Sequence, residues 1–264
     1  MLNANQKLWH RVIGASAIGP LHKITTMPCQ DAFAFESFSS GYSVIAVADG
    51  LGSAKLSDFG ARNAVDAAVA TAKNLITASP GNVAVLEDVA RKAARAARKE
   101  LEEKADVYNC KLRDIACTLI VAIMYQDDLA VAHIGDGAVI ARIGDELITV
   151  SGPAESEYAN EVTPLTGRDW EKYLRVAAKT SNVTAVMAFT DGCQRAAFKK
   201  TPEGLIPFHG FCDPVFSFIR EVEDEKEGAY EIESMLYSPK ICNNSEDDKT
   251  LVVVVVNPAK GTCL

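Results

Sequence analysis

Residues 44–53 read VIAVADGLGS, and this stretch decides how the chain is expected to fold. Its apolar run has no polar alternation, which is typical of a strand buried on both faces. The run stops at Asp49-Gly50, a pair that usually marks a hairpin turn. A hairpin needs a second strand directly afterwards, whereas residues 59–78 place apolar side chains at helical spacing. The sequence therefore predicts a strand followed by a helix, with the carboxylate of Asp49 at the end of the strand.

The same pattern occurs at two further places. Residues 183–192 (VTAVMAFTDG) form another apolar run that closes on Asp191 and a glycine. Residues 246–256 (EDDKTLVVVVV) place Asp247 and Asp248 at the opposite end of a strand, just before it begins. If neighbouring strands run in suitable directions, these points meet at one edge of the core. Carboxylates gathered there repel one another and raise each other's pKa, so such a cluster is stable at neutral pH mainly when it holds cations.

The composition favours one soluble globular unit. With 264 residues and 48% hydrophobic content, the chain can bury one large core, and the net charge of -8 argues against a nucleic-acid partner. No segment has the length and apolarity of a membrane span, and the start lacks the apolar stretch of a signal peptide. We therefore expect a cytoplasmic protein without a nucleic-acid or membrane partner.

The metal-binding residues available to the chain are mostly oxygen donors. Its seven cysteines include no CxxC pair, and its four histidines include no HExxH pattern. We expect reduced thiols in the core. Oxygen ligands favour Mg²⁺ or Mn²⁺ over Zn²⁺.

The predicted elements alternate between groups of strands and pairs of helices. Strands are predicted at 11–18, 32–36, 42–49, 115–125, 129–135, 138–143, 146–150, 183–190 and 251–256, and helices at 59–78, 83–105, 214–221 and 229–236. The strands between 115 and 150 are expected to form a meander, residues 152–172 a long surface loop, and the acidic residues 221–228 a solvated connection. Two sheets packed face to face with helices outside them, an α+β fold, account for this order.

Several short motifs, taken in order, resemble those of the metal-dependent protein phosphatases of type 2C, a serine/threonine phosphatase family. The motifs are PCQDAFAF at 28–35, VADGLGSA at 47–54, ACTLIVA at 116–122, HIGDGAVI at 133–140, AFTDGC at 188–193 and EDDKTLVVV at 246–254. Each motif alone is weakly specific, whereas the whole set in this order is strongly specific. The resemblance spans residues 14–256 and implies a single catalytic domain over residues 1–264 with a four-layer α-β-β-α sandwich.

The spacing of His22 ahead of Cys29-Gln30-Asp31 is similar to that of the compact bacterial branch of the family. The resemblance implies that the partners are phosphorylated proteins. Members of that branch often act beside a serine/threonine protein kinase and a von Willebrand A-type protein, and the resemblance suggests such partners here.

The resemblance also implies two Mg²⁺ or Mn²⁺ ions at one end of the sandwich, with a bridging hydroxide that attacks phosphorus. Matched by motif, Asp49 bridges both ions and the Gly50 carbonyl helps to hold the second. Asp191 and Asp247 hold the first ion, and Asp31 supports the water around the second. Asp49, Asp191 and Asp247 are thus the residues expected to be essential for catalysis.

Asp136 has two interpretations. It lies between two predicted strands, so a plain hairpin turn explains it as well as chemistry does. The resemblance instead implies that Asp136, with Asp191, binds a third and loosely held metal ion.

The chain departs from the family pattern at positions that bear on the substrate. Leu51 stands where eukaryotic relatives have a histidine, Thr26 stands where many relatives have a phosphate-binding arginine, and Gly137 begins a changed pair after Asp136. The nearest candidates to replace the arginine are His22 and Lys23, since a charged donor strengthens a hydrogen bond to phosphate.

The sequence thus leads to one main hypothesis and two alternatives. The main hypothesis is a Mg²⁺- or Mn²⁺-dependent phosphatase that acts on phosphoserine and phosphothreonine in proteins. One alternative is a catalytically weak pseudophosphatase that serves as a regulatory binding module, and the other is a hydrolase of small phosphoesters.

Overall fold

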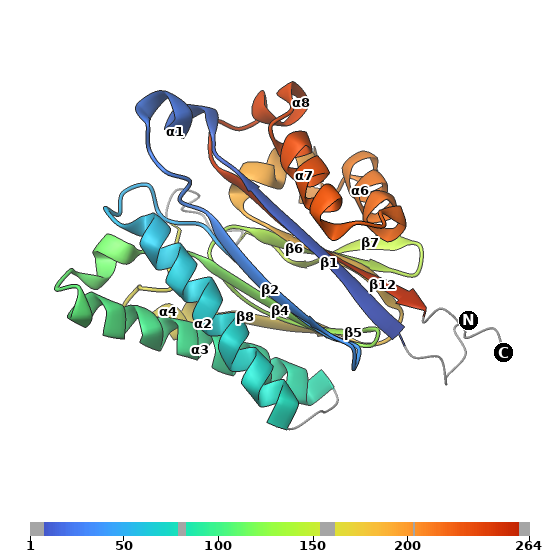
Figure 1. Cartoon of the computed structure of the whole chain (residues 1–264), viewed down its shortest axis with the longest axis horizontal. Helices are drawn as coiled ribbons and strands as arrows, with labels where there is room; N and C mark the ends of the chain where they lie inside the picture. Colours follow the sequence, from blue (N-terminus) through green and yellow to red (C-terminus); the bar gives the residue numbers. More distant parts are fainter. Residues whose placement is uncertain (1–7, 79–82, 154–161, 203, 259–264) are drawn as a thin grey trace.

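The computed structural model describes residues 8–78, 83–153, 162–202 and 204–258. Its centre is a pair of five-stranded antiparallel sheets stacked face to face. Each sheet carries helices on its outer face, as Figure 1 shows. The predicted four-layer α-β-β-α sandwich of the α+β class is therefore confirmed.

The first sheet contains the strand that ends at Asp49. Its strand order is β2-β3-β4-β5-β8, with bounds Ala32–Phe38, Tyr42–Ala48, Leu119–Tyr125, Asp128–Ile134 and Arg175–Lys179. Every residue of β3 is buried, as its unbroken apolar run predicts. Helices α2 (Ser57–Ala78) and α3 (Val83–Val107) cover the outer face, where small alanines such as Ala64, Ala68 and Ala93 allow close packing.

The second sheet contains the other two acidic strand ends. Its strand order is β1-β12-β9-β6-β7, with bounds Leu8–Ala17, Lys249–Pro258, Val183–Phe189, Ala138–Ile143 and Glu146–Ser151. Helices α6 (His209–Glu221) and α7 (Glu225–Leu236) cover its outer face through a cluster that includes Phe189, Phe216 and Ile232.

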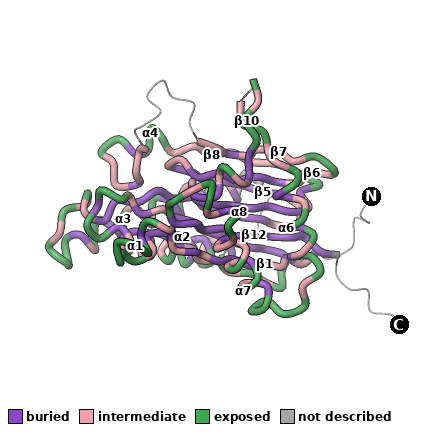
Figure 2. Tube along the Cα trace, turned by 90° about the horizontal axis from the view of Figure 1, so that it is seen from above, coloured by how far each residue is buried: buried purple, intermediate pink, exposed green. Residues whose placement is uncertain are grey.

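The inner faces of the two sheets form a third apolar cluster. Val47 and Ile120 from the first sheet meet Val186, Val252 and Val254 from the second. Figure 2 shows these central strands buried and the helices partly exposed at their outer surfaces. Uninterrupted apolar strands are needed here because both of their faces are covered.

The predicted meander over residues 115–150 is wrong. β4 and β5 pair in the first sheet, but β6 and β7 lie in the second, and β5 is not hydrogen-bonded to β6. The chain crosses from one sheet to the other at residues 135–137. A hairpin turn for Asp136 is therefore excluded, because the strands on its two sides are not partners.

Helices α6 and α7 both begin earlier than predicted. α7 begins at Glu225 because the Asp224 side chain accepts hydrogen bonds from the backbone N–H groups of Lys226 and Glu227, so part of the acidic connection is helical. α6 begins at His209 and contains Pro214.

Several short elements were not predicted. These are α1 (Pro20–Thr25), η1 (Leu112–Ile115), α4 (Trp170–Tyr173), β8, η2 (Asp191–Cys193), α5 (Gln194–Ala197), the hairpin β10 (Phe198–Thr201) and β11 (Gly204–Pro207), and α8 (Pro239–Cys242). The loop predicted over 152–172 ends in α4, and its residues 154–161 lie outside the described part of the chain.

Among the described helices, none combines the length and apolarity needed to cross a membrane. The cysteines of the described residues are all free, and Cys117, Cys193 and Cys212 are buried, as expected for reduced core thiols.

Candidate metal centre

Acidic residues from separate segments line one cavity at the end of the sandwich. The cavity has a volume of about 890 Å³, and its walls include Asp49 after β3, Asp136 between β5 and β6, Asp191 after β9, and Asp247 before β12. β9 and β12 are antiparallel, and Phe189 is opposite Leu251, so the end of one strand meets the start of the other. We call this the acidic cavity.

Asp49 is fixed through its backbone by Thr118. The Asp49 N–H donates to the Thr118 Oγ1 at 2.9 Å, and the Thr118 N–H donates to the Asp49 carbonyl at 2.8 Å. Gly50 follows in a confined space, where a Cβ atom would lie 2.7 Å from both the Gln30 carbonyl oxygen and the Ser57 Cβ. A glycine is therefore required at position 50 for packing as well as for access to its carbonyl.

The turn that carries Asp191 packs directly on the start of β12. A Cβ atom on Gly192 would lie 2.0 Å from the Asp248 carbonyl oxygen, so the two segments approach at a distance that only glycine allows. The Thr190 N–H donates to the Thr250 carbonyl at 3.1 Å. This contact fixes Asp191 beside Asp247.

Asp31 lies beneath the acidic cavity instead of in its wall. It is 7% exposed, and its Oδ2 accepts a hydrogen bond from Thr190 Oγ1 at 2.7 Å. Burial raises the pKa of Asp31 well above its usual range, and the nearby charges of Asp248 and Asp191 raise it further, while its bond with Thr190 opposes the shift. Asp31 is therefore not a wall residue of the acidic cavity, and its role in supporting an ion stays a prediction.

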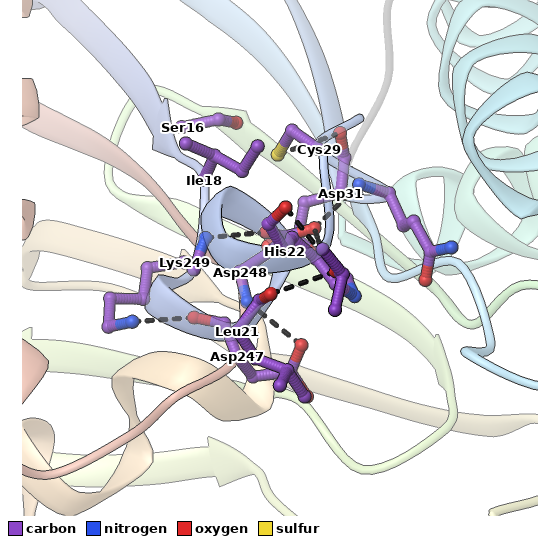
Figure 3. Close-up of polar contacts among 12 residues, drawn as sticks. Ser16, Ile18, Leu21, His22, Cys29, Asp31, Asp247, Asp248 and Lys249 are labelled. Atoms are coloured by element: carbon purple, nitrogen blue, oxygen red, sulfur yellow. Dashed lines mark hydrogen bonds and ion pairs between the residues drawn. The ribbon is translucent and has the colours of Figure 1, made fainter. Parts of the chain in front are cut away.

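Asp248 holds the segment around α1 against β12. It is 2% exposed, its Oδ1 accepts from the Gly19 N–H at 2.6 Å, and its Oδ2 accepts from the Gln30 N–H at 2.6 Å. His22 Nδ1 lies 2.9 Å from the same Oδ2 (Figure 3). Potential ligand atoms of His22, Asp247 and Asp248 lie within 4.8 Å of one another. Because both oxygens of Asp248 already accept hydrogen bonds, Asp248 is a structural clamp, whereas its neighbour Asp247 lines the acidic cavity.

Burial and mutual repulsion both act on Asp49 and Asp191. Burial raises the pKa of Asp49 well above its usual range, and Asp31, Asp191, Asp247 and Asp136 add to the shift. Burial raises the pKa of Asp191 to about 7, with added repulsion from Asp136 and Asp247. The carboxylates are thus close enough to oppose each other's ionisation, which is the condition under which bound cations stabilise a site.

Two carboxylate oxygens in this group have no hydrogen-bond partner. The Oδ1 atoms of Asp136 and Asp191 are buried, and no described residue donates to either of them. Buried polar atoms are normally paired, so an unpaired oxygen in a carboxylate cluster needs an explanation. Divalent Mg²⁺ or Mn²⁺ fits this donor set because these ions prefer carboxylate oxygens with additional water ligands.

Asp136 belongs to this group through its position between the sheets. Burial raises its pKa, and the charge of Asp247 acts in the same direction. Its backbone carbonyl accepts a hydrogen bond from the Gln194 side chain. On the other side, Arg175 donates to the Gly135 carbonyl at 2.7 Å, which fixes the crossing segment.

The two residues predicted to bind substrate lie in different surroundings. His22 lines the acidic cavity, with Nδ1 engaged by Asp248. The Lys23 Nζ lies 3.7 Å above the centre of the Tyr237 ring, and Lys23 is not part of the cavity wall. Thr26 ends α1 in the left-handed region, with φ of 56°.

Sequence reasoning missed Arg195. It lies on α5, lines the acidic cavity and donates from Nη1 to the Asn244 carbonyl at 3.1 Å. Among the described residues of the cavity wall it is the only lysine or arginine. The sequence carries no periodic signal for Arg195, because α5 is only four residues long.

Comparisons of the sequence give one family and one curated relative. Residues 18–236 match the family described as Protein phosphatase 2C. The Escherichia coli (strain K12) protein named Serine/threonine-protein phosphatase 3 is 29% identical over 251 residues, which cover 93% of this chain and 98% of that protein.

Solved structures share the fold at lower identity. The catalytic domain of serine threonine protein phosphatase PstP, in complex with 2 manganese ions, has a TM-score of 0.60 and 17% identity, and the match covers 94% of this chain and 99% of that one. Serine/threonine phosphatase Stp1 from Staphylococcus aureus has a TM-score of 0.63 and 10% identity, with 97% and 100% covered.

Proposed function

Because the chain belongs to the protein phosphatase 2C family and is a protein serine/threonine phosphatase of that type, we propose that it hydrolyses phosphoserine and phosphothreonine with two Mg²⁺ or Mn²⁺ ions bound at the acidic cavity. The observation that carries the proposal is the convergence of Asp49, Asp136, Asp191 and Asp247, from four separate segments, on one cavity. The two unpaired carboxylate oxygens support it independently.

Each acidic residue has a separate role in this proposal. Asp49, Asp191 and Asp247, with the Gly50 carbonyl, would hold the two ions. Asp136 with Asp191 would offer a place for a third. When bound, the ions supply the acidity that lets water attack phosphorus at neutral pH and offset the negative charge of the phosphate.

The remaining residues position the carboxylates, and protonation of the leaving group is expected to come from water. Thr118 fixes Asp49, and Thr190 supports Asp31 from below. Leu51 lines the cavity where a proton donor would otherwise stand, so no side chain at this position protonates the leaving oxygen.

Phosphorylated proteins are the proposed substrates, and a protein kinase that generates them is the expected opposing partner. The cavity wall includes the exposed residues Leu21, Asn243 and Glu246, which a bound polypeptide would contact.

The direct test is metal-dependent release of phosphate. Purified protein with millimolar Mn²⁺ is expected to release phosphate from a phosphothreonine peptide, measured colorimetrically, and excess EDTA is expected to abolish the release because the carboxylates then lack their ions. A rise in melting temperature with Mn²⁺ but no phosphate release from any phosphopeptide would favour the pseudophosphatase. Hydrolysis of p-nitrophenyl phosphate with every phosphopeptide left intact would favour the small-phosphoester hydrolase.

We expect Arg195 to bind the substrate phosphate in place of the arginine that Thr26 replaces. Arg195→Ala is expected to raise KM for a phosphopeptide about tenfold with a smaller change in kcat, because a charge-assisted hydrogen bond to the bound substrate is lost. Arg62→Ala is the matched control, since Arg62 is also exposed and donates to a single backbone carbonyl, that of Phe33 at 2.9 Å. A fall in kcat at constant KM would instead assign Arg195 to positioning the loop that carries Asp247.

A further inference from the structure

A second, smaller hollow adjoins the acidic cavity. It has a volume of about 170 Å³, and the residues lining it are Arg195, Ala196, Phe198, Lys199, Phe208, Gly210, Phe211, Lys240, Ile241 and Asn244. Arg195 and Asn244 belong to the walls of both spaces, and the Arg195 Nη1 bonds to the Asn244 carbonyl. The hollow and the acidic cavity are therefore adjacent and share Arg195 and Asn244.

The hollow carries positive charge on a negative protein. Its walls contain Arg195, Lys199 and Lys240, which come from α5, β10 and α8, and they contain no acidic residue. All three cations are exposed, and none forms an ion pair with a described residue. The whole chain has a net charge of -8, so this concentration of cations is local.

The floor of the hollow is apolar and partly aromatic. Phe198, Phe211 and Ile241 line the hollow and are buried. The Lys199 Nζ lies 4.1 Å above the centre of the Phe208 ring, so this ammonium group is held at the rim by a cation–π contact. A glutamate side chain matches this arrangement, because its aliphatic stem can pack on the rings while its carboxylate faces the cations.

We propose that this basic hollow is a substrate subsite that binds an acidic side chain close to the phosphorylated residue, so that the enzyme prefers phosphorylated sites in acidic surroundings. The volume is below the range typical of small-molecule pockets, which runs from about 300 to 1,000 Å³, and suits one side chain of a bound polypeptide. The shared wall places that side chain next to a phosphate in the acidic cavity. This inference rests on the proposed function for its substrate.

The charge of the rest of the protein predicts the opposite preference. A net charge of -8 and a cavity walled by carboxylates should repel an acidic peptide more than a neutral one. A preference for acidic peptides therefore requires a local basic site. The effect of the hollow can be told apart from the effect of the net charge, because the two favour opposite peptides.

The test compares two phosphothreonine peptides that differ only in having glutamate or glutamine on both sides of the phosphorylated residue. We expect kcat/KM for the wild-type protein with Mn²⁺ to be about fivefold higher for the glutamate peptide, the size expected for a few partly exposed charge pairs. The double variant Lys199→Gln, Lys240→Gln is expected to bring the ratio of the two values to about one.

Lys200→Gln is the matched control. Lys200 follows Lys199 in β10, so its side chain points to the opposite face of the strand, and it does not line the hollow. Lys199 and Lys200 are both exposed, and each Lys→Gln substitution removes one positive charge. The ratio in Lys200→Gln is expected to stay at the wild-type value.

A wild-type ratio at or below one overturns the proposal, and so does an unchanged ratio in the double variant or an equal fall in Lys200→Gln. The dissociation constants of fluorescein-labelled forms of both phosphopeptides, measured by anisotropy in EDTA, give the same comparison without turnover. If the wild-type protein hydrolyses neither peptide, the proposed function fails, while the ratio of dissociation constants still decides whether the hollow selects acidic residues.

Discussion

Asp49→Asn is expected to lower kcat/KM for a phosphopeptide by about a thousandfold and, at the same time, to stabilise the metal-free protein. The loss of activity follows because a bound metal ion contributes several kcal/mol of transition-state stabilisation, and each loss of about 1.4 kcal/mol lowers the rate tenfold. Asp49 is the residue proposed to contact both ions, and an amide is a weaker ligand than a carboxylate. The two measurements should therefore move in opposite directions.

The gain in stability arises from the repulsion around Asp49. Its pKa is raised by burial and by Asp31, Asp191, Asp247 and Asp136, so in the absence of metal the folded protein resists ionisation of this carboxyl. A neutral amide removes that cost. For a chain of this size, each kcal/mol of stabilisation raises the melting temperature by about 2–4 °C.

The pH dependence has a definite sign. A carboxyl with a raised pKa binds more protons in the folded state than in the unfolded state, so the stability of the metal-free wild type falls as the pH rises above the unfolded value. This loss continues through the folded pKa, which for Asp191 is about 7. The advantage of Asp49→Asn in EDTA is therefore expected to be larger at about pH 8 than at about pH 5, where Asp49 is more nearly protonated.

Thermal melts in EDTA and in Mn²⁺, together with phosphopeptide assays, check both parts. Mn²⁺ should raise the melting temperature of the wild type more than that of Asp49→Asn, because ions that bind only the folded state stabilise it. Asp145→Asn, in the exposed turn between β6 and β7, is the control and should behave like the wild type. A variant that melts below the wild type in EDTA at high pH would contradict the repulsion described for Asp49.

The sequence predicted the acidic cavity because its three main carboxylates stand at the ends of strands that are easy to recognise. β3, β9 and β12 are buried on both faces, so their apolar runs are uninterrupted and their ends are sharp. The helix after Asp49 excluded a hairpin at that position. These local signals fixed the strand ends, and the motif order supplied the arrangement of the sheets.

Features that depend on contacts between distant segments could not be predicted in this way. The hairpin interpretation of Asp136 failed because the strands on its two sides belong to different sheets. A short connection over residues 134–138 fits a hairpin and a crossing between sheets equally well, so the sequence alone does not distinguish them. Arg195 lies on a four-residue helix, too short to show a period, and reaches the cavity wall beside Asn244 of a remote loop. The helix start at Asp224 is different, because an aspartate at this position is a recognisable helix cap. The prediction missed it because the surrounding acidic residues were interpreted as a solvated connection.

The adjacent residues Asp247 and Asp248 have different roles that the sequence alone does not distinguish, and substituting them is expected to have large and opposite effects. Asp247 is exposed and lines the acidic cavity, whereas Asp248 is buried and accepts hydrogen bonds from Gly19 and Gln30. Asp248→Ala leaves two buried backbone N–H groups and the His22 ring without their partner. Removing one partner from such a buried polar cluster lowers the free energy of unfolding by about 3–5 kcal/mol, which corresponds to a fall of about 10 °C in melting temperature.

Asp247→Ala is expected to give the opposite result, with phosphatase activity lost and the melting temperature in EDTA little changed, because its side chain lies in the open cavity. Asp248→Asn should fall between wild type and Asp248→Ala, since the amide oxygen can still accept from one side of the clamp. Melting in EDTA separates the clamp from metal binding, and phosphate release in Mn²⁺ reports the metal site. If Asp247→Ala unfolds at a lower temperature than Asp248→Ala, the two roles are reversed. The buried carboxylate would then be the ligand and the exposed one the structural residue.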